Sequence, residues 1–598
     1  MNKPDETKAN DLQGNVQDGA GAPRRRSRRR RRGGHGKAGT AAPKTSPEAR
    51  SRLGLRIIWG GAILFALALA AANILLGNLN QDEGWYLLSA LRVHGGQLPY
   101  RDFLFTQGPG LPLVYGLLAP LWSWAGVIGG RVLTAVFGLA AAALAARLAG
   151  ECAPPNNRRS APLLAWLLLA CAPVHSYFSA IPKTYALAAL FLLAGFNLLT
   201  SRRPVCWMLG GAMLAFSAAT RISLGLALPV AGVALLLQRR NPRWRGAWLY
   251  FGVGGALALL ATYGVALLLW PADFLFSQSY HAVRAGGGLT KALTLRAGFA
   301  SRCVQAYPLA WTLAAGLFLD FAMRTNGMRD FFRRIVRPRR FPVLTAAAVS
   351  ALAVTLLHAS SPFPYDDYQT PVMPLFVAAA AAILAERMRD AGPRLKRSLP
   401  AFAALAALLA ALSSPLLMDW VTIRKDRFWF ETKPKPDVLV LRDAAREVRA
   451  HADALGTGLL LTQDAYLAVQ AGLDVPAGLE MGPFSIFPDM DSATARARHV
   501  HNVETLIDLI QGVDAADAGE PPPDPDSPTP QVPLLAATSG YTFALACPGT
   551  APLDDAQKAL LELELDAAFD PLGKPRDNFG QGHTRLSLWI RHGHNSRN

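Results

Sequence analysis

Long apolar segments separated by short polar ones run through the first two thirds of the chain. The first, residues 57–77, is about 20 residues long, which is the length that a helix needs to cross a bilayer. We predict membrane-crossing helices at residues 57–77, 130–149, 161–178, 183–200, 205–219, 222–238, 247–270, 306–324, 341–358, 371–387 and 399–416. A very large soluble core would not need so many long apolar segments. The pattern therefore predicts a polytopic α-helical membrane protein with about eleven crossings.

One further apolar segment, Leu111–Trp124, is short and is interrupted by Pro112 and Pro120. Counting it as a crossing would invert the side of every later loop. We predict instead that it forms a juxtamembrane or re-entrant helix on the outer side. The first outer loop then runs over residues 78–129, which is long for a simple connection.

Charge is divided unevenly along the chain, of which 51% is hydrophobic and 17% charged. Residues 1–56 and 57–416 both carry a large excess of Lys and Arg, whereas residues 417–598 carry an excess of Asp and Glu. With the N-terminus inside, most basic residues between 57 and 416 fall in inner loops, as the positive-inside rule requires. The expected location is a cell inner (plasma) membrane, with a cytoplasmic N-terminus.

Three parts are expected from these changes in composition. Residues 1–55 are rich in Gly, Ala, Ser and Arg and are predicted to be a disordered cytoplasmic tail. Their arginines resemble a nucleic-acid-binding arm, but a positive-inside anchor near anionic lipid is the simpler interpretation, so no nucleic-acid partner is expected. Residues 56–416 form the transmembrane part. Residues 417–598 are predicted to be a soluble α/β domain outside the membrane.

Within that last part, the spacing of apolar residues predicts individual elements. Helical spacing covers residues 437–450, 465–472 and 492–511, and residues 458–462 read as a buried strand.

The informative polar residues are the few acids of the outer loops. Asp82 and Glu83 come directly after the first crossing, at the membrane surface. A carboxylate there can remove a proton from an acceptor hydroxyl. The other interpretation is that the pair caps a helix starting near Gly84, a position where Asp is favoured. The spacing alone does not decide between the two.

A longer motif surrounds these acids. Asp82-Glu83-Gly84-Trp85-Tyr86, then Gly96-Gln97-Leu98-Pro99-Tyr100-Arg101-Asp102-Phe103, then Gly108-Pro109-Gly110, resembles the first outer loop of GT-C glycosyltransferases. The nearest branch contains protein O-mannosyltransferases, aminoarabinose transferases of lipid A and RgtA/B/C/D-like bacterial enzymes. The resemblance implies a GT-C-like fold that uses polyprenyl-phosphate-linked sugars, with its catalytic acid in this loop.

The resemblance implies that Asp82 is the base acting on the acceptor and that Glu83 assists or positions it. Other positions depart from the family pattern. Gln107-Gly108-Pro109-Gly110 lacks the basic residue expected near the donor phosphate, and Lys183 follows Pro182 where relatives carry an acid. Asp366-Asp367-Tyr368 stands where relatives have Arg-Tyr, so the tyrosine fits and the arginine does not.

Cations are needed to stabilise a leaving lipid phosphate. Arg221 is the most informative, because it interrupts two apolar segments, where a charge is costly unless paired; the alternative is an arginine snorkelling at a helix end. We predict these substrate-binding residues: Tyr86, Arg101, Asp102, Lys183, Arg221, Arg284 and Tyr368. No metal or other cofactor is required.

The predicted function is transfer of a sugar from a polyprenyl-phosphate donor to a hydroxyl of a lipid, glycan or protein acceptor on the extracytoplasmic face, with inversion. A transporter or flippase of lipid-linked glycans is an alternative, although such proteins typically show broken helices or internal repeats. A non-enzymatic membrane scaffold is a third, which the long Asp82 loop disfavours.

Overall fold

The computed structural model describes residues 47–279, 289–324, 327, 342–388, 392–513, 532–540, 542–543 and 552–594. The chain divides into two compact units, Met1–Arg52 and Leu53–Asn598. Of the first unit, only the start of the first helix is described.

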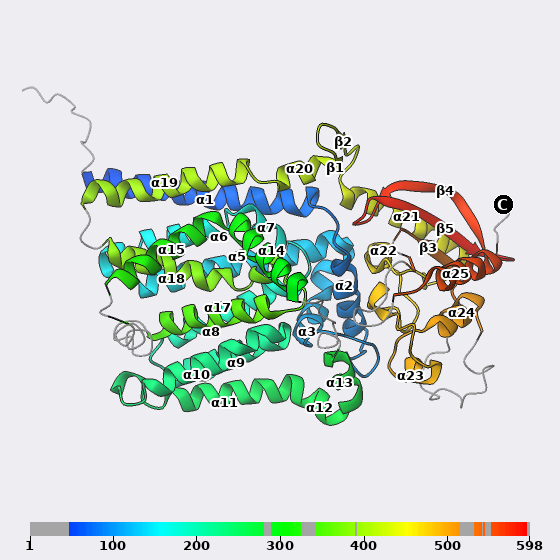
Figure 1. Cartoon of the computed structure of the whole chain (residues 1–598), viewed down its shortest axis with the longest axis horizontal. Coiled ribbons are helices and arrows are strands. Elements are labelled where there is room, and N and C mark those ends of the chain that lie inside the picture. The colour runs from blue at the N-terminus through cyan, green and yellow to red at the C-terminus, as the bar shows by residue number, and fades with distance from the viewer. Residues whose placement is uncertain are drawn as a thin grey trace, which may run out of the picture. The chain divides into compact units, whose positions relative to one another are not determined.

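The first two thirds of the described chain are helical (Figure 1). The helices are α1 (Pro47–Leu76), α2 (Gln81–His94), α3 (Gly110–Leu117), α4 (Ala119–Trp122), α5 (Gly126–Cys152), α6 (Ser160–Leu169), α7 (Pro173–Phe178), α8 (Thr184–Leu199), α9 (Pro204–Thr220), α10 (Ala227–Leu237), α11 (Ala247–Leu259), α12 (Val265–Leu269), α13 (Pro271–Ser279), α14 (Leu289–Ala306), α15 (Pro308–Met323), α17 (Pro342–Ser360), α18 (Met373–Arg387), α19 (Pro393–Leu412) and α20 (Leu416–Val421). Short 3₁₀ turns η3 (Ile222–Leu226) and η6 (Asp366–Gln369) lie among them.

Every predicted apolar segment is helical. Four helices are long and apolar enough to cross a membrane: Leu53–Leu76, Ala119–Cys152, Pro242–Leu269 and Pro342–Ser360. A fifth is counted if α14 and α15, which meet at an angle of 102°, form one broken span. Several others are apolar but shorter, so the number eleven stays a prediction. One predicted span, residues 161–178, is two helices, because Pro173 lacks the N–H that would continue α6 and starts α7 instead.

The segment Leu111–Trp124 does not form one helix. It divides into α3 and α4, and α3 is too short to span a bilayer, at about 12 Å for eight residues. Leu117 and Trp124 are exposed on it. The juxtamembrane position of the whole segment stays a prediction, because the candidate span Ala119–Cys152 includes α4.

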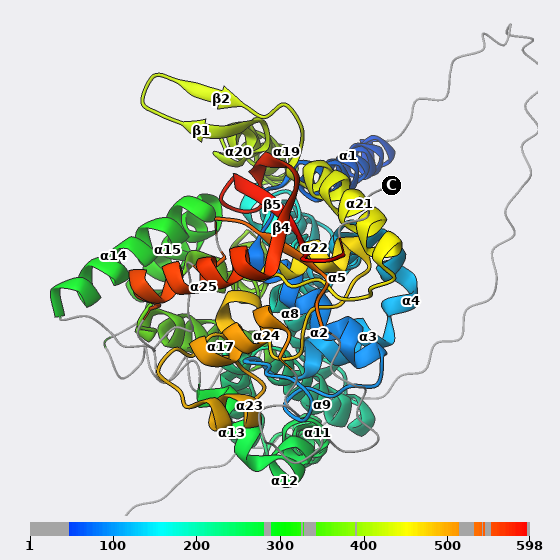
Figure 2. The ribbon, with the colours of Figure 1, turned by 90° about the vertical axis from the view of Figure 1, so that its right-hand side faces the viewer.

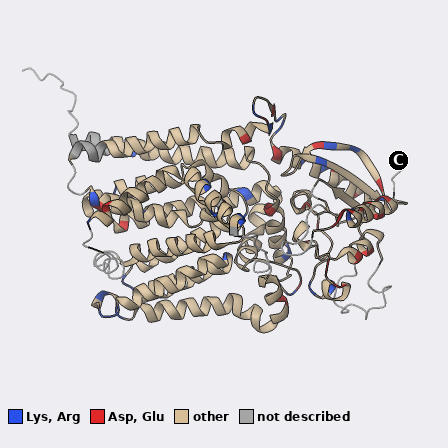
Figure 3. Cartoon of the chain, viewed as in Figure 1, with Lys and Arg blue, Asp and Glu red and all other residues tan. Residues whose placement is uncertain are grey.

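Helix direction alternates along the bundle, so that the connections fall at two ends. One end holds the last turn of α1, the first turns of α5 and α8 and the last turn of α17. At the other end Arg387 of α18 pairs with Asp320 of α15 at 2.8 Å. Figure 3 shows the bundle helices as mostly uncharged between these ends. Arg147, Arg202 and Arg239 stand near the ends of α5, α8 and α10, as predicted for the inner side, but the orientation in a membrane stays a prediction.

The last third combines helices with two small sheets. Its elements are β1 (Thr422–Lys425), β2 (Phe430–Thr432), α21 (Asp437–Leu455), α22 (Ala465–Ala471), α23 (Ser492–Ala497), α24 (Val503–Gln511), β3 (Leu535–Thr538), α25 (Asp555–Ala568), β4 (Phe569–Phe579) and β5 (Thr584–Arg591). β1 and β2 form an antiparallel hairpin, and the other sheet has the antiparallel order β3-β5-β4.

The elements predicted in this part are present with changes. Residues 437–450 and 465–472 correspond to α21 and α22. The predicted single helix over 492–511 is two helices, α23 and α24, because Asn502 caps a new helix at Val503. The segment 458–462 is extended but forms only isolated bridges, among them a parallel one between Leu461 and Ala536 of β3.

The C-terminal elements share an apolar core with the first loop. One cluster of buried residues joins Trp85 and Leu87 of α2 to Tyr466 of α22 and Leu588 of β5. Contact is closest at Gly84, where an added Cβ would lie 2.2 Å from the backbone nitrogen of Tyr466. Only glycine allows this approach. The helix that carries Asp82 is therefore held from outside the bundle.

Candidate active site

The N-terminus of α2 is capped by Asn80 with Glu83 as the second member of a capping box, and the Asp82 side chain takes no part in the cap. The Asn80 side chain accepts a hydrogen bond from the Asp82 backbone N–H at 3.1 Å. Glu83 closes the capping box by accepting the Asn80 backbone N–H at 2.8 Å. The helix begins at Gln81, three residues before the predicted start at Gly84. The Asp82 carboxylate is therefore free of the capping role.

Glu83 lies in a closed ion pair. Arg131 of α5 donates to both of its carboxylate oxygens, each at 2.6 Å, and both side chains are fully buried. The same guanidinium donates to the backbone carbonyls of Ile74, in the last turn of α1, and of Gly77 and Asn78, just after it. Glu83 thus ties α1, α2 and α5 together.

Asp82 lies beside a lysine that it shares with a second carboxylate. Lys183 Nζ, just before α8, is 3.0 Å from Asp82 Oδ2 and 3.2 Å from Asp367 Oδ2. The Tyr185 hydroxyl also donates to Asp367 Oδ2, at 2.8 Å. The Asp82 side chain is 31% exposed and that of Asp367 only 13%. Asp82 is therefore the carboxylate that a second molecule reaches more easily.

Arg221 provides the second cation of the cluster. It follows the last residue of α9, and its guanidinium carbon lies 4.7 Å from the ring centre of Tyr185 and 4.6 Å from that of Tyr368. Its Nη1 donates to the Thr184 hydroxyl at 3.3 Å. Two aromatic faces hold the charge by cation–π attraction. Arg221 is buried, so it does not snorkel to the surface as the alternative interpretation required.

Tyr86 covers the same cluster from α2. Its ring stacks on Trp85 at 3.8 Å between centroids. Burial raises the pKa of the Tyr86 hydroxyl, and the neighbouring Asp82 carboxylate raises it further, so the phenol stays protonated. The Trp85 indole N–H donates to Asp82 Oδ1 at 3.3 Å. Each Asp82 oxygen therefore has one partner, the indole or Lys183.

A buried hydrogen-bond chain connects η3 and η6 behind Arg221. The Thr355 hydroxyl donates to Gln369 Oε1 at 2.8 Å, and Gln369 Nε2 lies 3.2 Å from His358 Nδ1. His358 Nε2 lies 2.8 Å from the Ser223 hydroxyl. Because an amide nitrogen only donates, His358 Nδ1 accepts and Nε2 carries the proton. The chain fixes Ser223 and Gln369, which neighbour Arg221 and Tyr368.

These contacts define the candidate site: Asp82, Tyr86, Lys183, Tyr185, Arg221, Asp367 and Tyr368. Its two cations and three tyrosine hydroxyls suit an anionic phosphate, and its half-exposed carboxylate suits proton removal. Among the described residues, no group of three His, Cys, Asp or Glu side chains is placed to hold a metal ion. The side chain of Asp366 lies outside the described part of the chain.

Two predicted substrate-binding residues lie elsewhere. Arg101 pairs with its neighbour Asp102 through two hydrogen bonds of 2.8 Å, and its guanidinium lies over the Trp270 ring. Asp102 also accepts the Leu98 backbone N–H, so it closes a local turn. Arg284 lies outside the described residues. Of the predicted set, the structure therefore brings together Asp82, Tyr86, Lys183, Arg221 and Tyr368.

The sequence analysis did not identify Tyr185, Asp367 or Arg131 in these roles. Tyr185 follows Lys183 by two residues, so the sequence itself indicated that the two residues lie close together. Asp367 stands next to Tyr368 in a motif that was compared with the Arg-Tyr of the family, and the acid itself was given no role. Arg131, a charge inside an apolar segment, was a signal of the same kind as Arg221. Its partner was not predictable, because Glu83 lies 48 residues away in the chain.

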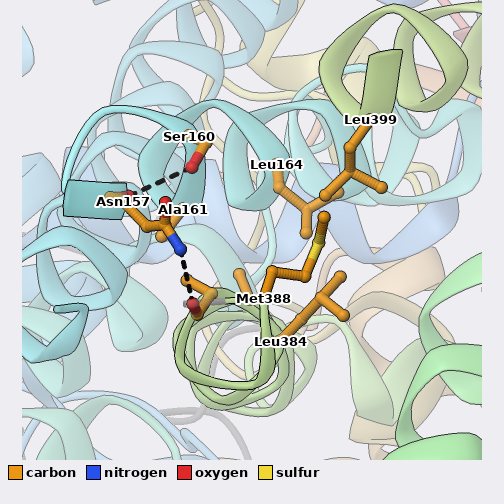
Figure 4. Close-up of a pocket in the computed structure, with 9 residues that line it drawn as sticks. Asn157, Ser160, Ala161, Leu164, Leu384, Met388 and Leu399 are labelled. Atoms are coloured by element: carbon orange, nitrogen blue, oxygen red, sulfur yellow. Dashed lines mark hydrogen bonds between the residues drawn. The ribbon is translucent and has the colours of Figure 1, made fainter. Parts of the chain in front are cut away.

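A surface pocket lies at the other end of α18 (Figure 4). Its walls are mainly aliphatic, with Leu164, Leu384 and Met388 pointing into it. Asn157 donates to the Ala385 carbonyl at 2.6 Å and so ties α18 to the start of α6. Since α18 begins beside η6 and is about 22 Å long, this pocket is separate from the candidate active site.

Comparison with solved structures identifies the fold. ArnT from Cupriavidus metallidurans in the apo state matches with a TM-score of 0.50 and 16% sequence identity, over 88% of this chain and 98% of that chain. The archaeal oligosaccharyltransferase AglB from Archaeoglobus fulgidus, in complex with an inhibitory peptide and a dolichol-phosphate, has a TM-score of 0.44 and 10% identity, over 80% and 69%. Arabinofuranosyltransferase AftD from Mycobacteria has a TM-score of 0.42 and 16% identity, over 90% and 41%.

No protein-family model matches the chain, and no curated protein matches it either. The likeness to ArnT extends over nearly the whole of that chain, and it shows that this protein shares the fold of ArnT. Together with its apolar helices, this fold makes it a multi-pass membrane protein.

Proposed function

We propose that the chain is a membrane glycosyltransferase that moves a sugar from a polyprenyl-phosphate-linked donor to an acceptor hydroxyl. The observation that carries the proposal is the contact between Asp82 and Lys183, 3.0 Å apart, beside the buried Arg221. A base and two phosphate-binding cations are the groups that this reaction needs from a protein. The GT-C fold is the second support.

In the proposed step, the acceptor oxygen attacks the anomeric carbon of the donor from the face opposite the phosphate. The new carbon–oxygen bond forms as the bond to the phosphate oxygen breaks, so the anomeric configuration inverts. The acceptor proton passes to Asp82, and the electron pair of the broken bond leaves on the polyprenyl phosphate. Lys183 and Arg221 stabilise the charge that develops there.

Lys183 links these two tasks. Without donor it pairs with Asp82 and Asp367. A donor phosphate competes for the same ammonium group, and in doing so it releases Asp82 for proton removal. Asp367 stays bonded to Tyr185 and keeps the lysine in place. In this scheme Asp82 reacts, whereas Glu83, held by Arg131, positions the helix that carries it.

The proposed function also requires a defined topology in the membrane. We assign residues 1–55 to a cytoplasmic tail, residues 56–416 to the transmembrane catalytic part and residues 417–598 to an extracytoplasmic domain, in an inner (plasma) membrane. The candidate site then lies at the outer surface, where a lipid-linked donor presents its phosphate at the headgroup level. The acceptor is a hydroxyl on a lipid, glycan or protein.

The test uses the full chain in proteoliposomes with a panel of polyprenyl-phosphate sugars. Release of polyprenyl phosphate is measured for the wild type, for Asp82→Asn and for Asp102→Asn. Asp102 is the matched control, because it is an aspartate of the same loop that bonds only within its own turn. We expect release by the wild type and Asp102→Asn and little by Asp82→Asn.

Two results would contradict the proposal. Equal release by Asp82→Asn and the wild type would remove Asp82 from the role of base. No release with any donor, combined with movement of intact donor across the vesicle membrane, would identify a transporter instead.

A further inference from the structure

The β1–β2 hairpin presents an exposed aromatic tip. Phe428, Trp429 and Phe430 lie at its turn and are 80%, 78% and 62% exposed. The turn itself is ordered by a hydrogen bond from the Asp426 backbone N–H to the Trp429 carbonyl at 2.7 Å. Three adjacent large aromatic side chains held in water by a formed turn are costly unless a partner covers them.

The base of the hairpin is fixed at the level where α1 ends. Lys433, one residue after β2, donates to the side chain of Asn78, two residues after α1. It also pairs with Asp437 at the start of α21, at 3.2 Å. Since α1 is long and apolar enough to cross a membrane, its end marks a membrane surface. The hairpin therefore starts at that surface.

From this level the hairpin extends sideways. Figures 1 and 2 both show β1 and β2 projecting from the side of the molecule beside α20, rather than folding back over the C-terminal sheet. α19, which precedes α20 and the hairpin, has Leu405, Leu409 and Leu412 exposed, as expected for a lipid-facing surface. The aromatic tip thus continues an apolar face that already meets lipid.

The charged residues of the hairpin indicate which kind of lipid surface it meets. Three basic residues, Arg424, Lys425 and Arg427, and two acidic ones, Asp426 and Glu431, flank the aromatic residues, and all five are exposed. Arg424 lies 3.8 Å from Glu431, so the hairpin has a small excess of positive charge. The guanidinium of Arg427 lies over the Phe428 ring, 5.7 Å from its centre. Aromatic rings flanked by basic side chains are typical of segments that lie in the headgroup layer of anionic bilayers.

We propose that the hairpin of residues 422–432 is an interfacial anchor that inserts Phe428, Trp429 and Phe430 into the headgroup region of an anionic bilayer. The anchor joins the last membrane helices to α21. It therefore holds the C-terminal elements close to the membrane surface at which the candidate active site opens. The proposal concerns lipid contact and stands apart from the proposed catalysis.

The test places a fluorescent NBD label on the full chain through Trp429→Cys or, as control, Leu563→Cys. Leu563 is also an exposed apolar residue, 64% exposed on α25. The unsubstituted protein is taken through the same labelling to subtract reaction of native cysteines. Proteins are reconstituted in phosphatidylcholine alone or with 30% phosphatidylglycerol. Quenching is measured with shallow spin-labelled lipid and with aqueous iodide.

We expect the label at position 429 to be quenched by spin-labelled lipid and shielded from iodide, and the label at 563 to behave oppositely. Adding Arg424→Glu, Lys425→Glu and Arg427→Glu to Trp429→Cys should reduce the lipid quenching, most strongly with phosphatidylglycerol. Iodide quenching equal at both positions would overturn the proposal. Shielding from iodide without lipid quenching would also overturn it, because a protein surface would then cover the tip.

Discussion

Two ion pairs start from neighbouring residues of α2 and end in different surroundings. Glu83 meets Arg131 in a fully buried pair, in which both carboxylate oxygens are bonded. Asp82 meets Lys183 in a pair that is 31% exposed on the acid side, and the lysine is shared with Asp367. A closed pair holds helices together, and its carboxylate and guanidinium are not available to a substrate. A shared, half-open pair can exchange one partner for a ligand.

The largest expected effect comes from replacing each acid in turn. Asp82→Asn should lower kcat by about 10²- to 10⁴-fold, the usual contribution of a general base, with the thermal midpoint nearly unchanged. Glu83→Gln should lower the thermal midpoint and leave kcat nearly unchanged, because the loss of this carboxylate disrupts packing but leaves Asp82 in place. Steady-state kinetics and thermal unfolding of both purified variants check this. A Glu83→Gln protein that is stable but inactive would contradict the division of roles.

The closed pair is broken from its other side by Arg131→Met. This leaves the buried Glu83 without its cation, which should destabilise the fold by about 3–5 kcal/mol. The double variant Glu83→Gln with Arg131→Met should recover part of that loss, since no unpaired charge remains buried. Chemical unfolding in detergent measures both. A single variant as stable as the wild type would show that the pair is not closed.

The open pair is tested by Lys183→Met. Charge-assisted hydrogen bonds to a phosphate contribute about 1.5–3 kcal/mol each, so the Kd for a polyprenyl-phosphate donor should rise roughly 10- to 100-fold. Arg101→Met is the control, because Arg101 pairs with Asp102 instead. Titration of both variants with a donor measures the effect. Equal weakening in both would place Arg101 in the site as well.

A smaller effect is expected at the other end of α2, where Arg92 lies 3.2 Å from the buried Glu480. Burial raises the pKa of Glu480 to about 7, although Arg92 opposes the shift. Between its ordinary pKa and about 7, folded Glu480 holds a proton that the unfolded chain releases. Stability should therefore fall as pH rises through this window, by about 1 kcal/mol between pH 6 and 8.

Glu480→Gln should flatten that dependence, whereas Glu562→Gln, on the exposed side of α25, should leave it unchanged. Thermal midpoints at pH 6 and pH 8 provide the readout. A wild-type midpoint that rises across this range, with no change in Glu480→Gln, would contradict the assignment.

The comparison also shows what the amino-acid sequence could reveal. Long apolar segments predicted the helices, since burial in lipid imposes one simple pattern on the chain. Arg221 was found by the same logic, because a charge among apolar residues needs a reason. Spacing alone did not separate Asp82 from Glu83, and only the family resemblance gave Asp82 the role of base. Their partners Lys183 and Arg131 lie 101 and 48 residues away, and only the fold brings them together.

The positions at which helices begin and end were also not predicted from the sequence. Neither the division at Pro173 nor the early start of α2 follows from hydropathy, because both depend on single backbone hydrogen bonds. The exposure of Phe428, Trp429 and Phe430 was likewise not predicted, since it depends on how the hairpin lies among its neighbours.

The most direct test is a single-turnover measurement with enzyme in excess over a labelled polyprenyl-phosphate sugar. Donor binding is first matched between the wild type and Asp82→Asn, so that only the chemical step differs. If Asp82 is the base, Asp82→Asn binds the donor at least as tightly as the wild type and releases polyprenyl phosphate at least about 100-fold more slowly. Equal single-turnover rates in the two proteins would contradict the assignment.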